Sequence, residues 1–138
     1  MNRFHPCDAL VAAALVSACA ALPGPQCAPP ASAGSIDRVY FGHARPDGGE
    51  VSDEEFQAFL REVVTPRYPQ GLTLVRASGQ WRSSDGRVVD ERSTVLELAH
   101  AASATDRVLV GEIVDEYKRR FRQEAVLRVT QPACVAVS

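Results

Sequence analysis

The chain has 138 residues, of which 46% are hydrophobic and 23% charged, and its formal net charge is -2. These values are typical of one globular domain with a short appendage. A near-neutral surface lacks the basic patch that phosphate binding requires, which argues against nucleic acid as a partner.

The N-terminal residues 1–18 have the pattern of an export signal, with Arg3 ahead of an apolar run over 9–16 and small residues after it. The segment "VSAC" is similar to a bacterial lipobox, in which cleavage before Cys19 leaves that cysteine to carry a lipid. An ordinary cleavage near Ala20 is the alternative. We expect a signal peptide in either case, and prefer a periplasmic protein of the cell envelope that is anchored to a membrane through lipid on Cys19.

Residues 19–35 are rich in proline and alanine, a composition that predicts a stiff, extended tether. Cys27 in this tether and Cys134 near the C-terminus are the cysteines that remain once Cys19 is lipidated or removed. In an oxidising compartment we expect the two to form a disulfide bond. Two unpaired thiols are the alternative.

The pattern changes at Ile36, so we place a single domain over 36–138. A β-branched and aromatic run with period two predicts a strand over 36–41 that ends at Gly42. The loop that follows, 43–51, is rich in turn-forming residues.

Ser52 and Glu55 form a capping box, which predicts the start of a helix. We expect this helix to end at Thr65, because Pro66 disfavours the helical conformation of the residue before it. Its buried face is predicted to carry five apolar side chains: Phe56, Phe59, Leu60, Val63 and Val64.

Two strand-like runs, 72–81 and 88–99, flank the turn "SSDG" and predict a hairpin. Ser103 caps a second helix. A last strand is expected over 125–130, ending before Pro132.

The order strand, helix, strand, strand, helix, strand predicts a ferredoxin-like α+β sandwich, with two helices on one face of a four-stranded antiparallel sheet. In this topology the first strand lies between the last and the third, and the second lies at the far edge. The chain enters the first strand and leaves the fourth at the same end of the sheet. Cys27 and Cys134 should therefore meet there.

The same topology argues against a metal site, because it places His43 and His100 at opposite ends of the sheet. Each histidine is expected to be an ordinary loop residue. We find no glycine-rich phosphate loop and no nucleophile elbow, so no cofactor is expected.

Loops at the other end of the sheet provide one candidate recognition site for an anionic or aromatic group. It comprises polar and aromatic side chains after the first strand and at the hairpin: His43, Arg45, Asp47, Trp81, Arg82 and Asp85. We prefer a simpler interpretation, in which Trp81 anchors the hairpin against the core and Arg82 is solvated.

The open face of the sheet is the second candidate. Alternation predicts that one set of side chains points toward the helices: Val39, Phe41, Leu96, Leu98, Leu127 and Val129. Tyr40, Glu97 and Arg128 would then point away, joined by Arg76 if Val75 and Ala77 are buried. Glu97 between a tyrosine and arginines suits proton transfer, but cross-strand ion pairing explains the same charges.

A partner protein or a second copy over this face is more plausible than catalysis. Uncovered, the face would expose the apolar side chains Val95, Val126 and Leu74.

The chain resembles the bacterial family called domain of unknown function 3574 in five separated motifs: "VYFG" at Val39, "RPDGGEVS" at Arg45, "VVTPRYPQGLT" at Val63, "GQWR" at Gly79 and "QEAVLRVTQPACV" at Gln123. The resemblance implies a small exported or lipid-anchored envelope protein. It also implies a cysteine before the first strand and one in the closing motif, which Cys27 and Cys134 match. It implies no activity and no catalytic residues.

Two functional hypotheses follow, besides a purely architectural role. We prefer a binding module that acts through its sheet face or through loops, with five candidate contact residues: Arg76, Trp81, Arg82, His43 and Arg45. The alternative is a small enzyme without a cofactor, in which Glu97 is the base and Tyr40 or Arg128 assists.

Overall fold

The computed structural model describes residues 26–101 and 103–137. The predicted signal peptide and Cys19 lie outside these residues. The elements along the chain are β1 (Ser32–Gly42), α1 (Asp53–Phe59), η1 (Leu60–Val64), α2 (Thr65–Arg67), β2 (Thr73–Arg82), β3 (Val88–His100), α3 (Ala104–Phe121) and β4 (Leu127–Val135).

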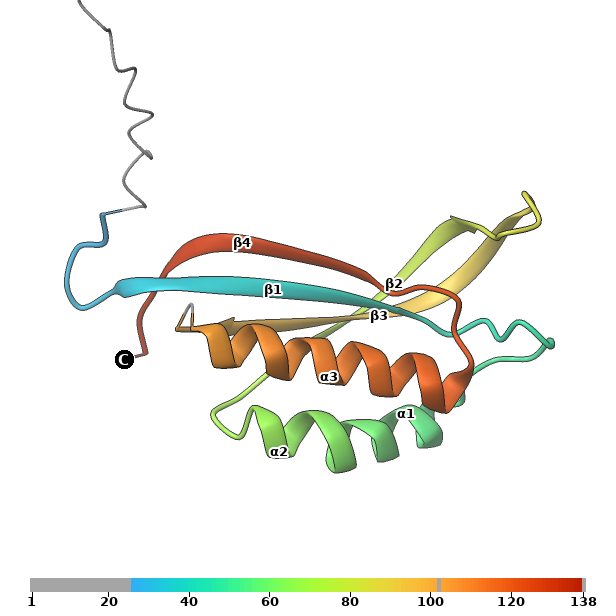
Figure 1. Ribbon diagram of the computed structural model, residues 1–138, viewed down its shortest axis with the longest axis horizontal. Helices are drawn as coiled ribbons and strands as arrows, with labels where there is room; N and C mark the ends of the chain where they lie inside the picture. The colour runs from blue at the N-terminus through green and yellow to red at the C-terminus, as the bar shows by residue number, and fades with distance from the viewer. Residues whose placement is uncertain (1–25, 102, 138) are drawn as a thin grey trace, which may run out of the picture.

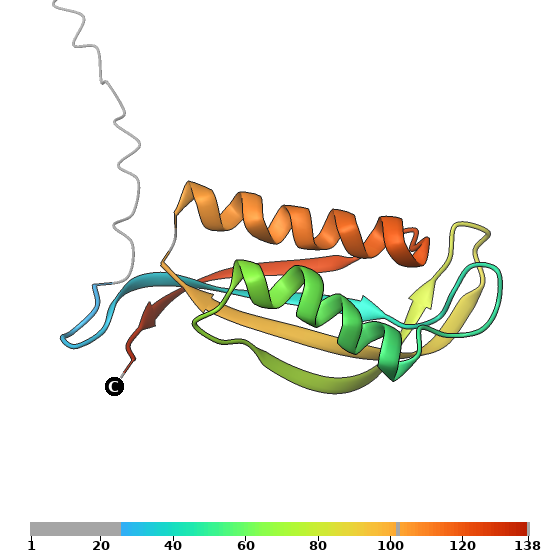
Figure 2. The same cartoon turned by 90° about the horizontal axis from the view of Figure 1, so that it is seen from below.

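The four strands form one sheet in the order β2-β3-β1-β4, with every neighbouring pair antiparallel. The consecutive segments α1, η1 and α2 form one continuous helical segment, and α3 forms the second helix. Both lie on the same face of the sheet (Figures 1 and 2). The predicted α+β sandwich and its strand order are confirmed. Among the described residues, no helix is long and apolar enough to cross a bilayer.

The predicted capping box at Ser52 and the predicted cap at Ser103 are both present, and Ser103 also forms a capping box. The hydroxyl of Ser52 accepts a hydrogen bond from the backbone of Glu55, and Ser103 does the same with Asp106. The prediction that the first helix ends at Thr65 is wrong, because the helical path continues to Arg67 with Pro66 inside the last turn.

The reason is the π-helical segment η1 just before the proline. The N–H of Thr65 donates to the carbonyl of Leu60, five residues back. In a regular helix the proline ring would meet the carbonyl four residues earlier, and the wider turn accommodates the ring.

The core lies between the helices and the covered face of the sheet. Val39, Phe41, Leu96 and Leu98 point into it with no exposed surface, as predicted. Aromatic rings fill its centre, where the ring centroids of Phe41 and Tyr117 are 4.4 Å apart. Burying one large apolar side chain of this kind contributes about 1.5 to 3 kcal/mol.

The predicted orientation of β4 is wrong. Leu127 and Val129 are 55% and 40% exposed, on the open face. Arg128 pairs in register with the buried Val39 and therefore points toward the helices.

A buried carboxylate explains this orientation. Asp37 is fully buried and accepts hydrogen bonds from Nε and a terminal nitrogen of Arg128, at 2.9 and 3.0 Å, and from the hydroxyl of Thr130. Nε2 of His100 lies 2.8 Å from the same carboxylate. Burial raises the pKa of Asp37, but these hydrogen bonds outweigh it and leave the pKa below its usual value.

His100 is the last residue of β3 and is buried, so its description as an ordinary loop residue is wrong. Its Nδ1 lies 3.0 Å from the carbonyl of Ala101. Both ring nitrogens thus face acceptors, which favours the protonated ring. Burial lowers the pKa of His100, but the bonds to Ala101 and Asp37 raise it above its usual value.

His43 is also buried, just beyond the other end of β1. Its ring nitrogens lie 3.1 Å from the carbonyl of Val51 and 2.9 Å from the hydroxyl of Thr94. Burial lowers the pKa of His43. The two histidines therefore lie at opposite ends of the sheet, and neither is a plain loop residue. Within residues 26–101 and 103–137, no group of three or more His, Cys, Asp or Glu side chains is placed to hold a metal ion.

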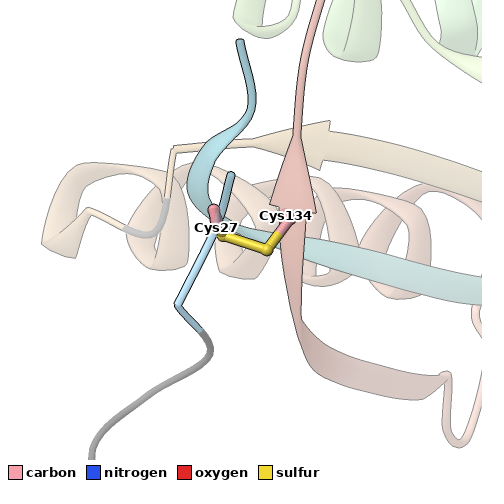
Figure 3. The surroundings of a disulfide bond; sticks show 2 residues. All are labelled: Cys27 and Cys134. Carbon is pink, nitrogen blue, oxygen red and sulfur yellow. A yellow bond between two sulfur atoms is a disulfide. The ribbon is translucent and has the colours of Figure 1, made fainter. Parts of the chain in front are cut away.

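Cys27 and Cys134 form a disulfide bond at the end of the sheet where the chain enters β1 and leaves β4 (Figure 3). The predicted pairing is confirmed. The sheet extends further here than predicted, because β1 begins at Ser32 and β4 continues to Val135. β4 is an edge strand with β1 as its only neighbour in this sheet, and proline is tolerated in edge strands because its missing N–H need not pair with a second strand.

Candidate functional site

The β2–β3 hairpin bends away from the helices at the end of the sheet that lies opposite the disulfide (Figure 1). A cavity of about 440 Å³ lies on the open face beside this bend. Three segments line it: the hairpin, the loop after β1 and the connection from α3 to β4.

The sheet beneath the cavity is built from small residues. Gly42 pairs with Ser93, and Gly79 pairs with Glu91 in the next row of the ladder. A side chain at Gly79 would meet nothing within 4 Å. The missing side chain of Gly79 leaves open space, whereas the carboxylate of Glu91 fills the space beside Gly42. Tyr40, Val89 and Leu127 add apolar surface around the cavity.

Trp81 belongs to this cavity and not to the core. It is 42% exposed and follows Gly79 by two residues on the same face of β2. The preferred interpretation, that Trp81 anchors the hairpin against the core, is therefore wrong.

Glu91 is the central charged group of the cavity. Its carboxylate lies against Gly42, where an added Cβ would be 2.5 Å from both carboxylate oxygens. It accepts a long hydrogen bond, at 3.4 Å, from the N–H of Ala44. Burial raises the pKa of Glu91, and the Ala44 N–H opposes this only in part.

The arginines of the lining are already paired. Arg87 contacts Asp85 at 2.7 Å, in a pair that lies at the hairpin tip. Arg45 contacts Glu55 at 2.6 Å and lies 5.7 Å from the centre of the Phe121 ring.

Glu124 sits at the rim and holds the hairpin tip. It accepts hydrogen bonds from the N–H and the hydroxyl of Ser84, at 3.3 and 3.0 Å. Glu91 and Glu124 are thus the carboxylates of the lining that have no basic partner within 4 Å in the described part of the chain.

The structure brings only some of the predicted binding residues together. Arg45 and Trp81 line the cavity, joined by Asp85. His43 is buried in the core, and Arg82 donates to the carbonyl of Gly86 within the hairpin, outside the cavity.

Arg76 lies on the other face of the sheet. It pairs in register with Thr94, which contacts the buried His43 on the helix side. Arg76 was expected on the open face only if Val75 and Ala77 were buried, and this condition is not met because Val75 is 52% exposed.

The three catalytic candidates are also separated. Tyr40 lines the cavity and Arg128 binds Asp37 beneath the helices. Glu97 lies on the open face, outside the cavity lining, in an ion pair with Arg38 at 2.7 Å. The three residues therefore do not form a single site. The cross-strand ion pairing considered as the alternative for Glu97 is present, with Arg38 as its partner.

Sequence reasoning missed Glu91. The signal was the period of two along β3, which runs from Glu97 through Val95 and Ser93 to Glu91 on the same face. The second part of the signal was Gly79, which pairs with Glu91 across the strands. A glycine at this position leaves open space beside the Glu91 carboxylate.

These features define a ferredoxin-like α+β sandwich with a ligand-sized cavity on its open face. The family model of a protein of unknown function (DUF3574) matches residues 37–137, and the chain belongs to this family. The predicted family is confirmed. No match is found among curated proteins.

Two similar solved structures are those of a phage SAM lyase. The complex with S-methyl-5'-thioadenosine is 17% identical with a TM-score of 0.59, and the match covers 75% of this chain and 90% of that one. The apo state is 18% identical with a TM-score of 0.56, over 76% and 90%. At these identities the likeness concerns the fold alone.

Proposed function

We propose that this protein is an exported, lipid-anchored module of the cell envelope that binds a small molecule in the cavity beside the β2–β3 hairpin. The observation that supports ligand binding is Glu91, a half-buried carboxylate that faces a cavity of about 440 Å³ and has no basic partner among the described residues. Small-molecule sites are usually cavities of about 300 to 1,000 Å³ with a few placed polar groups in a largely apolar lining.

The envelope half rests on the signal-like residues 1–18 and on Cys19 as the lipid attachment point. The Cys27–Cys134 disulfide supports it, since such bonds persist in oxidising compartments. The test is the intact mass of protein extracted from membranes. We expect a chain from Cys19 to Ser138 plus lipid, and a gain of two hydrogens on reduction; a lipid-free chain with another start would contradict the anchor.

Ligand binding is tested by filling the cavity. Gly79→Phe places a ring where the structure has open space, and Thr73→Phe adds the same ring to the open face of β2 outside the cavity. A soluble small-molecule library is screened against both variants and the unmodified protein by ligand-observed NMR. Binding that survives Thr73→Phe and is lost in Gly79→Phe supports the proposal, whereas binding retained in Gly79→Phe contradicts it.

A protein partner or a second copy over the rest of the open face stays a prediction. Leu127 and Val129 are exposed there. Arg76 does not contribute to that face, because it lies on the helix side of the sheet.

Catalysis by Glu91 is the second candidate, and its raised pKa in a cavity shared with Tyr40 is the observation that favours it. Glu97, the base first considered, lies outside the cavity. Because a phage SAM lyase has a similar fold, SAM is the first substrate to test. Formation of S-methyl-5'-thioadenosine by the unmodified protein and its loss in Glu91→Gln would favour an enzyme; no turnover would leave the binding module.

A further inference from the structure

We propose that the ligand of this cavity is an organic cation, whose positive group lies between the indole of Trp81 and the carboxylate of Glu91. The inference rests on the proposed small-molecule site and names the class of molecule that it selects. Three properties of the lining support it: its charge, its aromatic surface and its size.

The charge of the lining favours a positive ligand. Arg87 is paired with Asp85, and Arg45 with Glu55, so a neighbouring carboxylate offsets the positive charge of each arginine. Glu91 has no basic partner within 4 Å in the described chain, and its hydrogen bond from Ala44 is long. A cation would supply the missing counter-charge in a partly desolvated site, where such a contact is stronger than in water.

Glu124 extends this field to the rim. Its partner is Ser84, a neutral group, so its negative charge is not compensated there. A second carboxylate at the entrance, without a basic partner in the described part of the chain, raises the local concentration of cations and lowers that of anions.

The aromatic surface favours an organic cation over a metal ion. Trp81 is 42% exposed toward the cavity and Tyr40 lies on the sheet beneath it. The face of an indole attracts alkylated ammonium or sulfonium groups, because the ring quadrupole is negative at its face. A metal ion needs several converging ligands, and no group of three candidate ligands occurs within the described residues.

The size of the cavity supports the same class. A volume of about 440 Å³ is far larger than a bare ion requires, and Val89 and Leu127 give it apolar walls. A cation with an apolar or aromatic body would bury that body while its charge contacts Glu91.

The test compares two probes of the same shape that differ in charge. Choline carries a quaternary ammonium group, and 3,3-dimethylbutan-1-ol replaces the nitrogen with carbon. Trp81 is the single tryptophan of the chain, so its fluorescence reports binding directly, and calorimetry provides an independent affinity. We expect choline to bind at least about tenfold more tightly than the neutral probe.

Two matched variants locate the charge responsible. Glu91→Gln keeps the shape of the side chain and should abolish the preference for choline. Glu97→Gln removes the same charge from the same face of β3, outside the cavity, and should keep the preference. Thermal unfolding of both variants shows that each is folded.

The outcomes separate this inference from the function on which it rests. Equal affinity for the two probes, or a preference that persists in Glu91→Gln, overturns the cation inference. If neutral or anionic library members bind and Gly79→Phe abolishes their binding, the small-molecule site stands without it. If no molecule of any charge binds, both are wrong.

Discussion

At the scale of single residues, Gly34 and Gly42 are both closely packed, but against different kinds of neighbouring atoms. A Cβ at Gly34 would lie 2.5 Å from the carbonyl of His100 and 2.8 Å from Val135, so rigid backbone occupies the space. A Cβ at Gly42 would lie 2.5 Å from the carboxylate of Glu91, the mobile end of a long side chain. Gly34 therefore serves the fold, and Gly42 serves the position of one carboxylate.

Replacing each glycine by alanine separates these roles. Gly34→Ala should lower the free energy of unfolding by about 1 to 3 kcal/mol, because the backbone must shift. Gly42→Ala should cost less than about 1 kcal/mol but displace the Glu91 carboxylate and weaken ligand binding. Urea unfolding and ligand titration measure the two effects, and equal losses of stability would contradict the assignment.

The pH dependence of stability should report the Asp37–His100 pair. The pKa of His100 is raised above 6.5 in the folded protein, so its contribution is complete below pH 6.5 and is lost as the pH rises through the folded pKa. His100→Gln keeps a donor toward Asp37 without the charge. We expect the stability difference between the two proteins to be about 1 to 3 kcal/mol below pH 6.5 and to shrink above it.

Urea unfolding at pH values on both sides of 6.5 measures this difference. The pKa of His43 shifts in the opposite direction, but His43 is present in both proteins and cancels in the comparison. A difference that grows with rising pH would contradict a protonated His100.

At the scale of elements, short-range sequence patterns predicted the features that depend on neighbouring residues, which are the helix starts and the buried face of each central strand. Capping residues defined both helix starts at Ser52 and Ser103, and alternation located the buried side chains of β1 and β3. The orientation of β4 was missed, because Leu127 and Val129 have the more apolar side chains but Arg128 is required by Asp37, 91 residues away in sequence. The cavity was missed for the same reason, since its lining comes from β1, the β2–β3 hairpin and the connection from α3 to β4, which are far apart in the sequence.

The bent hairpin is held at its tip by Ser84 and Glu124. Both side chains are exposed, so Glu124→Ala should change global stability by less than about 1 kcal/mol. It should nevertheless speed hydrogen exchange of the amides over 83–87, because local opening of the tip no longer breaks this contact. Asp115→Ala removes an exposed carboxylate from α3 and is the control. Unchanged exchange over 83–87 in Glu124→Ala would show that the Ser84–Glu124 contact does not stabilise the hairpin tip.

At the scale of the whole molecule, the covalent and ligand-binding ends are separate. The Cys27–Cys134 disulfide joins the segment before β1 to the end of β4 (Figure 3). The β2–β3 hairpin lies at the opposite end of the sheet (Figure 1), and the cavity is lined by this hairpin. An anchor on Cys19 would attach the protein at the disulfide end. The cavity would then point away from the membrane.

This separation predicts that stability and binding respond differently to loss of the disulfide. The bond closes a loop between residues 107 positions apart, so a Cys27→Ser, Cys134→Ser double variant should lose about 4 to 5 kcal/mol of unfolding free energy. In the absence of denaturant, ligand affinity should stay within about twofold of the unmodified protein, because the native sheet around Glu91 does not depend on the bond. Urea unfolding and ligand titration on the same samples test both statements. A parallel loss of affinity in folded protein would mean that the two ends are coupled through β1, the strand that lies between β3 and β4 and links the disulfide end to Gly42.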